Sequence, residues 1–412
     1  MKKSTLLSIN NYYYLRGGAE FVFLEQNRLM EESGFDVVPF AMKHSKNMTT
    51  PWSEYFVEEI EFGEDYSFIE KLTRLPKVIY SMEAQKKISA LISKTFPDIC
   101  HAHNIYHHIS PSIFSTLKKN GIPTVLTLHD LKLACPSYSM LTHDGICERC
   151  KGGNIFNVVK QKCIKGSTAL STIAYIETTL NRYLGSYIDN IDYFIVPSKF
   201  YLEKFVEWGF NREQFIHVPN FVDIDIYKPD YTVGKRFLYF GRLGVEKGLP
   251  TIIKAASKAN IPLTFVGTGP DQNELKTLAN KLNVDVEFLG FQSGENLHSA
   301  IRAAKCVVIA SEWYENAPIS ILEAYALGKP VIGARIGGVP ELIKEETGLT
   351  FKSGSADDLA KTMIELINRS ESQIEDMGKA GRTWVEQDFS SNKYRERLLN
   401  IYKSLGVNLP SK

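Results

Sequence analysis

Short apolar runs alternate with helix-length amphipathic stretches along the whole chain, and this alternation constrains its fold more than any other feature. Apolar runs separated by helices are typical of buried parallel strands in a doubly wound α/β sheet. In the first half, the runs cover residues 6–9, 36–41, 98–101, 123–129 and 192–197. In the second half, they cover residues 236–240, 263–266, 286–288, 306–310 and 330–333. The repetition predicts two sheets, one in each half.

The length of the chain supports the same division. A chain of 412 residues exceeds the size at which one hydrophobic core usually suffices. We expect a first domain over residues 1–220 and a second over residues 221–389, with the seam near residues 221–234, where the periodicity is interrupted. Residues 390–412 contain an amphipathic helix. A polar insertion rich in lysine, glycine and cysteine spans about residues 131–166.

Charge and hydropathy limit the classes of partner. The chain carries 48 basic and 47 acidic residues, a formal net charge of +1, which gives no electrostatic case for a nucleic-acid partner. Residues 1–10 have a charged start but only a short apolar run, too little for a signal peptide, and no stretch approaches the ~18 consecutive apolar residues of a membrane span. We therefore expect a soluble, cytoplasmic protein whose cysteines are thiols or metal ligands rather than disulfides.

Two glutamates, Glu315 and Glu323, enclose seven residues. Glu315 follows the apolar run 306–310, and Glu323 lies in the helix that comes next, whose first turn suits Pro318. Eight helical positions span about 12 Å, enough for two acids to hold opposite ends of one extended ligand. Unpaired N–H groups of residues 317–320 would favour an anion between them. The spacing favours a ligand with hydroxyls at each end and phosphate in the middle, which is the shape of a nucleotide sugar.

This segment resembles the E-x7-E signature of the retaining glycosyltransferases of family 4. Residues 241–248 resemble that family's diphosphate clamp, residues 17–20 its N-terminal glycine loop, and residues 218–223 its interdomain strand ending. One E-x7-E alone occurs by chance in most proteins. The ordered set of motifs, which extends over nearly all of the chain, is far more specific.

The resemblance implies the GT-B architecture, in which two Rossmann-like doubly wound domains face each other across a cleft. Residues 1–220 would then lie on the acceptor side, residues 221–389 would bind the nucleotide sugar, and residues 390–412 would cross back to the first domain. The implied activity is hexosyl transfer, with retention, from a nucleoside diphosphate sugar to an acceptor hydroxyl in bacterial surface polysaccharide or glycoconjugate assembly. No catalytic metal is implied. Two alternatives stay open: a sugar-nucleotide epimerase of the same architecture, and a catalytically silent nucleotide-binding scaffold.

Two cations follow the predicted strand 236–240. Arg242 and Lys247 would stabilise the negative charge that accumulates on a departing nucleoside diphosphate. Taken alone, the two side chains are better explained as a solvated pair at a helix start, and only the set of motifs favours the functional role. By resemblance, Glu315 would bind the hydroxyls of the donor sugar and Glu323 those of the ribose, and neither would need to act as a nucleophile.

The remaining donor-binding candidates lie in loops. Glycines after the first strand lack a Cβ, so backbone N–H groups there can approach phosphate or sugar oxygen. Where the family often has Gly-aromatic-Gly after the first glutamate, this chain has Asn-Ala-Pro, which leaves the identity of the sugar open. A glycine loop after the strand at 263–266 resembles one that packs near the nucleotide. The candidates are Gly17, Gly18, Asn316, Ala317, Pro318, Ile319, Gly267, Thr268 and Gly269.

Histidines cluster after two predicted strands of the first domain. His129 closes the run 123–129, a position that in similar enzymes contacts the donor sugar near the reacting carbon, although a strand-end histidine is often only a structural hydrogen-bonding group. Asp130 follows it. Strand alternation places His101 and His103 on the same side, so a metal site is conceivable there. With His107 and His108 they form a histidine-rich loop that, by resemblance, faces acceptor or donor instead.

Four cysteines in the insertion form a C-x11-C-x2-C-x12-C array: Cys135, Cys147, Cys150 and Cys163. A small segment with few apolar residues cannot form a hydrophobic core and needs a cross-link to be stable. Four thiolates around Zn²⁺ supply such a cross-link. A structural zinc site is the first hypothesis, with iron–sulfur ligation, disulfides or free thiols as alternatives. Cys100 and Cys306 lie in predicted strands and are expected to be inert core residues.

One basic stretch bears on the acceptor. Residues 70–94 contain six basic and two acidic residues with apolar residues at helical intervals. Such a helix can lie against anionic lipid, although charged amphipathic helices are usually only solvated. Membrane contact at the inner face of the plasma membrane would suit a lipid-linked saccharide acceptor.

Overall fold

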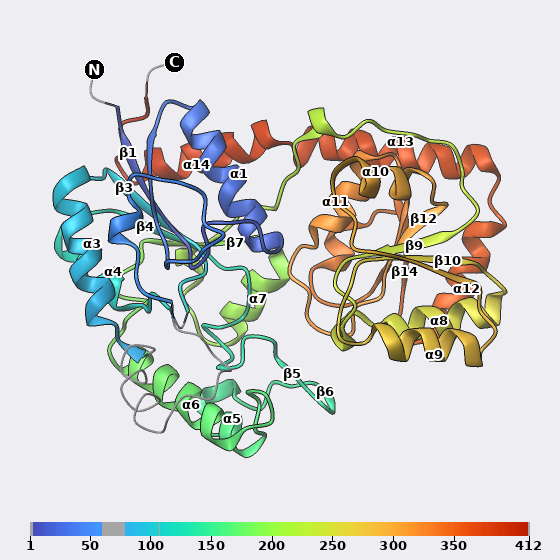
Figure 1. Ribbon diagram of the computed structural model, residues 1–412, viewed down its shortest axis with the longest axis horizontal. Helices are drawn as coiled ribbons and strands as arrows, with labels where there is room; N and C mark the ends of the chain where they lie inside the picture. The colour runs from blue at the N-terminus through green and yellow to red at the C-terminus, as the bar shows by residue number, and fades with distance from the viewer. Residues whose placement is uncertain (1–2, 60–78, 107, 411–412) are drawn as a thin grey trace.

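Two six-stranded parallel sheets stand side by side in the computed structural model, which describes residues 3–59, 79–106 and 108–410 (Figure 1). The strand order is β2-β1-β3-β4-β7-β8 in the first sheet and β11-β10-β9-β12-β13-β14 in the second. In each sheet the order reverses beside the first strand, between β1 and β3 and between β9 and β12. Open α/β sheets bind ligands at the carboxyl ends of the strands that flank such a reversal.

The elements of the first domain are as follows. Its strands are β1 Thr5–Ile9, β2 Asp36–Phe40, β3 Ile99–Ala102, β4 Thr124–Thr127, β7 Tyr193–Val196 and β8 Phe215–His217, and a hairpin pairs β5 Leu141–Thr142 with β6 Gly145–Ile146. Its helices are α1 Gly18–Glu32, α3 Met82–Thr95, α4 Ser112–Lys119, α5 Asn157–Lys160, α6 Thr168–Tyr183 and α7 Lys199–Glu207.

The second domain repeats the plan. Its strands are β9 Phe237–Phe240, β10 Leu263–Val266, β11 Val286–Gly290, β12 Cys306–Ile309, β13 Val331–Ala334 and β14 Gly348–Phe351. Its helices are α8 Leu249–Ala259, α9 Gln272–Lys281, α10 Gly294–Arg302, α11 Ile319–Ala326, α12 Ala356–Ile367 and α13 Glu371–Asp388, and α14 Ser391–Ser404 follows.

The strands are apolar on both sides because helices cover both faces of each sheet. Along β1, Leu7 and Ile9 lie in one hydrophobic core and Leu6 in the core on the opposite face. Along β12, Val308 and Val307 divide in the same way between two cores. This two-sided burial explains why the strands appear in the sequence as continuous apolar runs rather than alternating ones.

The sequence expectation differs from the structure at several strands. The edge strands β8 and β14 were not predicted. Strand β4 ends at Thr127, and Leu128, whose N–H donates to the Ile195 carbonyl, belongs to the loop that follows. His129 therefore lies beyond the strand rather than at its end.

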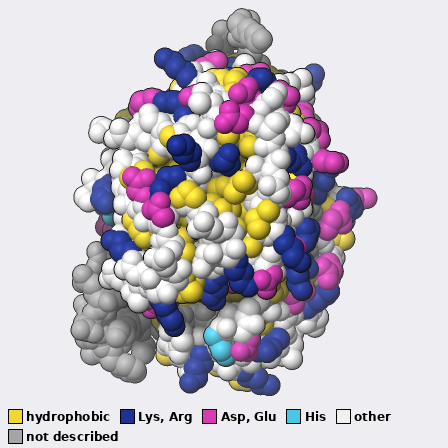
Figure 2. Space-filling view, turned by 90° about the vertical axis from the view of Figure 1, so that its right-hand side faces the viewer, with side chains coloured by type: hydrophobic (Ala, Val, Ile, Leu, Met, Phe, Trp, Pro, Cys, Tyr) yellow, Lys and Arg dark blue, Asp and Glu magenta, His cyan; other side chains and the backbone are white. Residues whose placement is uncertain are grey.

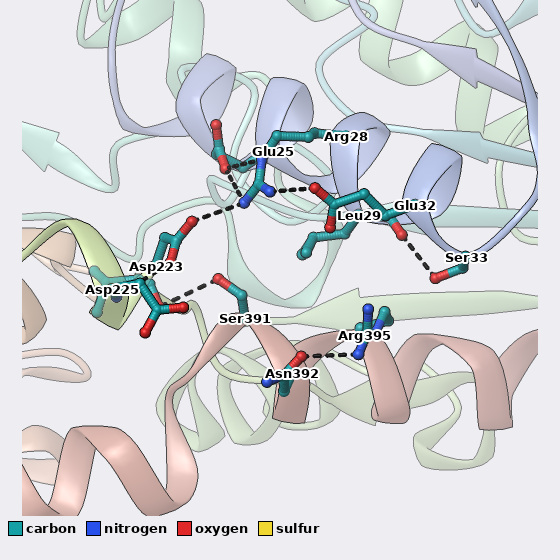
Figure 3. Close-up of polar contacts among 11 residues, drawn as sticks. Glu25, Arg28, Leu29, Glu32, Ser33, Asp223, Asp225, Ser391, Asn392 and Arg395 are labelled. Carbon is teal, nitrogen blue, oxygen red and sulfur yellow. Dashed lines mark hydrogen bonds and ion pairs between the residues drawn. The ribbon is translucent and has the colours of Figure 1, made fainter.

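The chain crosses between the domains twice, at neighbouring points. The Val222 N–H donates to the Phe389 carbonyl at 3.0 Å, and Val222 pairs with Ser390 in a parallel bridge. Figure 3 shows Asp223 beside the start of α14, where the Arg28 guanidinium of α1 lies 3.0 Å from the Asp223 carboxylate. Both crossings are thus tied to each other, and one is tied to the first helix.

Helix α14 returns to the first domain and lies beside α1 (Figure 1). Tyr394, Leu398 and Tyr402 are buried in the core on that face of the first sheet. The Tyr394 ring stacks on Phe221 with centroids 4.0 Å apart, so the helix grips the end of the interdomain segment as well as the sheet.

Replacing Tyr394 by phenylalanine removes only its hydroxyl, which donates to Gln26 Oε1 at 2.8 Å. A buried acceptor loses its partner, so we expect the free energy of unfolding to fall by about 1–2 kcal/mol. Thermal unfolding measures this change. The matched control is Tyr183→Phe, at a side chain that is 86% exposed, where a change within about 0.5 kcal/mol is expected. Equal shifts in the two variants would contradict the contact.

The predicted basic stretch at 70–94 is only partly described, because residues 70–78 lie outside the described residues. Its described end belongs to α3, whose apolar residues Ala84, Ile88, Leu91 and Ile92 are buried against the sheet. Within residues 3–59, 79–106 and 108–410, no helix is both long and apolar enough to cross a bilayer.

The face of the second domain that points away from the first carries mixed charge. Figure 2 shows basic and acidic side chains interspersed around a group of hydrophobic ones near the middle of the face. Because neither sign dominates, this face presents no extended field of one sign to a polyanion.

Candidate functional site

The loops after β9 and β12 meet at the strand reversal of the second sheet. Lys247 ends a single 3-10 turn, Val245–Lys247, that follows β9, and Glu315 lies in the loop after β12. The Lys247 ammonium is 2.5 Å from Glu315 Oε1. The two charges are thus paired where an open sheet of this kind holds its ligand.

Several groups fix the Glu315 carboxylate. The Ser311 hydroxyl donates to its Oε1 at 2.7 Å, and the Lys247 ammonium lies over the Trp313 ring, 5.1 Å from the centroid. Burial by itself would raise the pKa of Glu315, but the charge and hydrogen bond of Lys247, with the Ser311 hydroxyl, outweigh it and hold the pKa below its ordinary value. Glu315 is therefore a carboxylate at neutral pH.

Arg242 is not part of this pair. Its guanidinium binds the Glu246 carboxylate at 2.5 Å within the same loop, and 59% of its side chain is exposed. The two predicted cations therefore have different settings: Lys247 is fixed by a buried acid, whereas Arg242 is held at the surface of the loop.

The glycine loop after β10 packs tightly against the loop after β9. A Cβ on Gly267 would lie 2.0 Å from the Gly241 carbonyl oxygen, and one on Gly269 would lie 2.1 Å from that of Leu243. The Leu243 N–H also donates to the Thr268 carbonyl at 3.0 Å, while the Thr268 residue is exposed. The glycines are required here because the two backbones touch.

The N-terminal glycine loop faces the second domain. Gly17 precedes α1 in extended backbone, and Gly18 begins the helix. A Cβ on Gly18 would lie 3.5 Å from the Ile319 Cδ1 at the start of α11. The two loops that were predicted to hold the donor from opposite domains are therefore neighbours.

The segment between the two glutamates joins the domains through its polar groups. Asn316 accepts a hydrogen bond from the Ser198 hydroxyl at 2.8 Å and donates to the Leu128 carbonyl at 3.1 Å. The Ala317 carbonyl accepts from Asn220 at 2.7 Å. All three contacts join the second domain to residues of the first.

The helical spacing expected between Glu315 and Glu323 is wrong. Pro318 has extended backbone and caps α11, which begins only at Ile319, so three of the seven intervening residues lie outside the helix and the 12 Å rise of eight helical positions does not apply. Glu323 accepts a hydrogen bond from the Tyr227 hydroxyl at 3.1 Å. Burial raises the pKa of Glu323.

His129 belongs to a stack of three imidazoles inside the first domain. The ring of His103 stacks on His101 at 4.9 Å and on His129 at 5.2 Å, and its Nδ1 lies 2.9 Å from His129 Nε2. The predicted placement of His101 and His103 on one side is confirmed. At the far end, His101 contacts the Tyr402 hydroxyl of α14 at 2.6 Å and Thr127 Oγ1 at 2.7 Å.

The stack is neutral. Burial lowers the pKa of His129 to about 4 and that of His101 to about 3, and it lowers the pKa of His103 well below its ordinary value. Burial also raises the pKa of Asp130 to about 6. His107 lies outside the described residues.

Acidification is expected to destabilise the protein through these histidines. Below the ordinary histidine pKa near 6.5, these histidines are protonated in the unfolded chain but stay neutral in the native stack. Each of them therefore lowers the free energy of unfolding by up to about 1.4 kcal/mol per pH unit, until the pH reaches its native pKa. We expect the loss of melting temperature between pH 7.5 and pH 5.0 to be smaller in His101→Gln than in the wild type. The control His143→Gln changes an exposed side chain. Identical pH dependence in the two variants would contradict the assignment.

Sequence reasoning missed several groups around the ion pair. Ser311 and Trp313 contact its members, and Tyr314 donates its hydroxyl across the domain boundary to Glu148 at 2.8 Å. Ser311, Trp313 and Tyr314 lie within four residues of Glu315, so their proximity in sequence was the available signal. Nothing local marks Glu148.

The four cysteines of the insertion line one small cavity, in which Cys135 and Cys150 are buried and Cys147 and Cys163 are partly exposed. All four are free thiols. In the part of the chain that the structure describes, no three His, Cys, Asp or Glu side chains are arranged to hold a metal ion as they stand.

Known proteins share this architecture. The crystal structure of Anabaena HepE in complex with UDP-glucose matches with a TM-score of 0.68 at 16% identity, covering 97% of this chain and 99% of that one. At that identity the likeness shows the fold, and it confirms the predicted GT-B architecture of two facing Rossmann-like domains.

Two relatives are similar in sequence. A GDP-mannose-dependent monoacylated alpha-(1-6)-phosphatidylinositol monomannoside mannosyltransferase of Corynebacterium glutamicum is 29% identical over 54% of this chain and 64% of that protein. An N-acetyl-alpha-D-glucosaminyl L-malate synthase of Bacillus anthracis is 26% identical over 78% of this chain and 79% of that protein. The chain thus spans slightly less than two thirds of the length of the first.

Family models divide the chain at the interdomain segment. The model for glycosyl transferases group 1 matches residues 228–384, which hold the ion pair and α11. The model for glycosyltransferase family 4 matches residues 16–226, which begin at the glycine loop and make up more than half of the chain. The resemblance read from the motifs is confirmed, and the protein belongs to glycosyltransferase family 4.

Proposed function

We propose that the protein transfers a sugar from a nucleoside diphosphate sugar to an acceptor hydroxyl, with retention at the anomeric carbon. The observation that carries the proposal is the Lys247–Glu315 pair at the strand reversal, whose glutamate lies in the loop that leads to α11, where Ile319 meets Gly18 of the other domain. The relatives support the donor class, since one is named as GDP-mannose-dependent and one holds UDP-glucose. By family analogy, the acceptor is a saccharide or lipid-linked saccharide of surface polysaccharide assembly.

The charges of the site suit diphosphate departure. As the bond between the anomeric carbon and the phosphate oxygen lengthens, negative charge accumulates on the diphosphate, and a fixed ammonium stabilises it more in the transition state than in the ground state. Lys247 would supply this charge, with Arg242 as a second cation after release from Glu246. Lys247 and Ser311 both donate to Oε1 of Glu315. The fixed carboxylate would accept hydrogen bonds from the donor sugar.

Retention would proceed by front-face displacement, which needs no protein nucleophile. In front-face displacement the acceptor oxygen bonds to the anomeric carbon while its proton passes to the departing phosphate oxygen. A histidine with a pKa of about 4 is a weak base at neutral pH, so His129 would position a sugar hydroxyl as a neutral hydrogen-bonding group. Glu323, on α11, would bind the ribose.

Thermal unfolding against a panel of nucleoside diphosphates and nucleotide sugars tests the donor. A ligand at 100 times its dissociation constant adds roughly 2.7 kcal/mol to the native state, so one base should raise the melting temperature clearly. The matching donor is then incubated with simple glycoside acceptors, and the proton spectrum of the product gives its anomeric configuration. Absence of both a shift and transfer would overturn the proposal, and an inverted product would overturn the retaining mechanism.

A further inference from the structure

The insertion between β4 and α6 has little regular structure to hold it together. It contains two-residue strands, β5 and β6, and a helix of four residues, α5. Tyr138 and Met140 adopt left-handed backbone, with φ of 60° and 47°, which costs such residues roughly 1–2 kcal/mol each. Strain of this kind persists only where surrounding contacts over-determine the backbone, so the insertion needs a fixed point.

Four cysteines supply the fixed point. Cys135, the Cys147–Cys150 pair and Cys163 come from three separate parts of the insertion, yet all four line one cavity of about 10 Å³. A volume of that size holds about one water-sized particle, which suits a single ion. Four thiolates are the ligands of structural zinc. We propose that these four cysteines bind one zinc ion.

The sulfurs surround the cavity without yet meeting at its centre, since the described residues contain no group arranged to hold a metal. Rotation about χ1 carries a sulfur from one staggered position to another without moving the backbone. Because none of the four is in a disulfide, each is available as a ligand. Zinc binding would then require the four side chains to close on the ion.

The surroundings can balance the charge of such a site. Zinc with four thiolates carries a net charge of about −2. The Arg182 guanidinium of α6 donates to the carbonyls of Leu133 and Ala134 at 3.0 and 2.9 Å, and it interacts electrostatically with Cys135 and Cys150. A cation is thus held beside two of the proposed ligands.

The proposed zinc site lies next to a contact between the two domains. Glu148 lies between the paired cysteines Cys147 and Cys150, and its carboxylate contacts the Lys204 ammonium of α7 and the Tyr314 hydroxyl, each at 2.8 Å. Tyr314 precedes Glu315 in the loop after β12. The zinc ion would hold the turn that carries Glu148, and so brace the first domain against the loop that holds the ion pair. This role is independent of the identity of any sugar donor.

Metal analysis of the purified full-length chain tests the proposal. After purification without chelators and incubation with zinc sulfate, we expect about one zinc per chain, and X-ray absorption at the zinc edge should give four Zn–S distances near 2.3 Å. Removal of the metal should speed tryptic cleavage within residues 131–166 by about tenfold or more, because the apo-insertion opens. Iron in place of zinc, or zinc bound through nitrogen and oxygen, would overturn it.

Cysteine variants separate this site from the other thiols. Cys147→Ala and Cys163→Ala should each lose the bound zinc, whereas Cys100→Ala and Cys306→Ala, at fully buried positions in β3 and β12, should keep it. If the ligand variants fail to fold, the wild type still tests the proposal. Less than about one tenth of a zinc ion per chain, with all four insertion thiols free to titrate, would contradict zinc binding. A disulfide among the four cysteines would contradict it as well.

Discussion

Replacing Lys247 by methionine is expected to lower kcat for sugar transfer by a factor of about 10²–10³, the usual cost of losing one charge-stabilising group. The methylene chain is kept, so packing changes little. The Glu315 carboxylate loses its partner at 2.5 Å, and an unpaired buried charge lowers the free energy of unfolding, here by at most about 3 kcal/mol because Lys247 is partly exposed. Steady-state kinetics and thermal unfolding measure the two effects.

A second substitution separates stability from function. In the double variant Lys247→Met/Glu315→Gln no buried charge is left unpaired, so the melting temperature should return towards that of the wild type while activity stays low. Lys258→Met is the control, since that exposed lysine pairs with Asp357 away from the site. Activity of Lys247→Met within twofold of the wild type, or recovery of activity in the double variant, would show that the pair serves the fold alone.

Alanine at Gly267 should be among the most destabilising single changes in the second domain. Its φ of +132° is a conformation that residues with a Cβ rarely adopt, and the added Cβ would lie 2.0 Å from the Gly241 carbonyl oxygen. Since the obstacle is backbone, the loop after β9 must move, and we expect a loss of about 3 kcal/mol or more. Displacement of that loop should also abolish the melting-temperature shift given by the donor nucleotide.

The control is Gly294→Ala, which has the same kind of backbone strain without a steric clash. Gly294 also has positive φ, +54°, but a Cβ there would meet nothing within 4 Å. Gly294→Ala should cost only about 1–2 kcal/mol, the left-handed penalty itself, and should leave nucleotide binding intact. Similar losses in Gly267→Ala and Gly294→Ala would mean that the close approach of the two loops has no energetic weight.

The fold was largely predictable because parallel strands buried on both faces leave continuous apolar runs. The two strands of the six-stranded sheets that escaped are edge strands with weak signals. Strand β8 has only three residues, and β14 begins at Gly348, which has no side chain to bury. Each is a strand because its neighbour offers hydrogen-bonding partners, and that is a property of the sheet rather than of the segment.

The site was predictable as a set of residues but not as a geometry. Lys247 and Glu315 were each identified from a local motif, yet 68 residues separate them, and only the adjacency of β9 and β12 brings them together. The expected partnership of Glu315 with Glu323 rested on eight positions of helix, whereas α11 begins at Ile319, four residues after Glu315. Contacts across the domain boundary, such as Tyr314 with Glu148, depend on docking that no local pattern records.

The double crossing at Val222 and Ser390 has a practical meaning for protein engineering. Because the chain leaves the first domain and returns to it at paired positions, the second domain is a module grafted into the first at a single point in space. A chimaera that exchanges the donor half with a relative therefore needs two splice junctions, and they must be cut and rejoined together. A single junction near 222 would import a foreign α14 and place its buried tyrosines against a sheet that did not evolve with them.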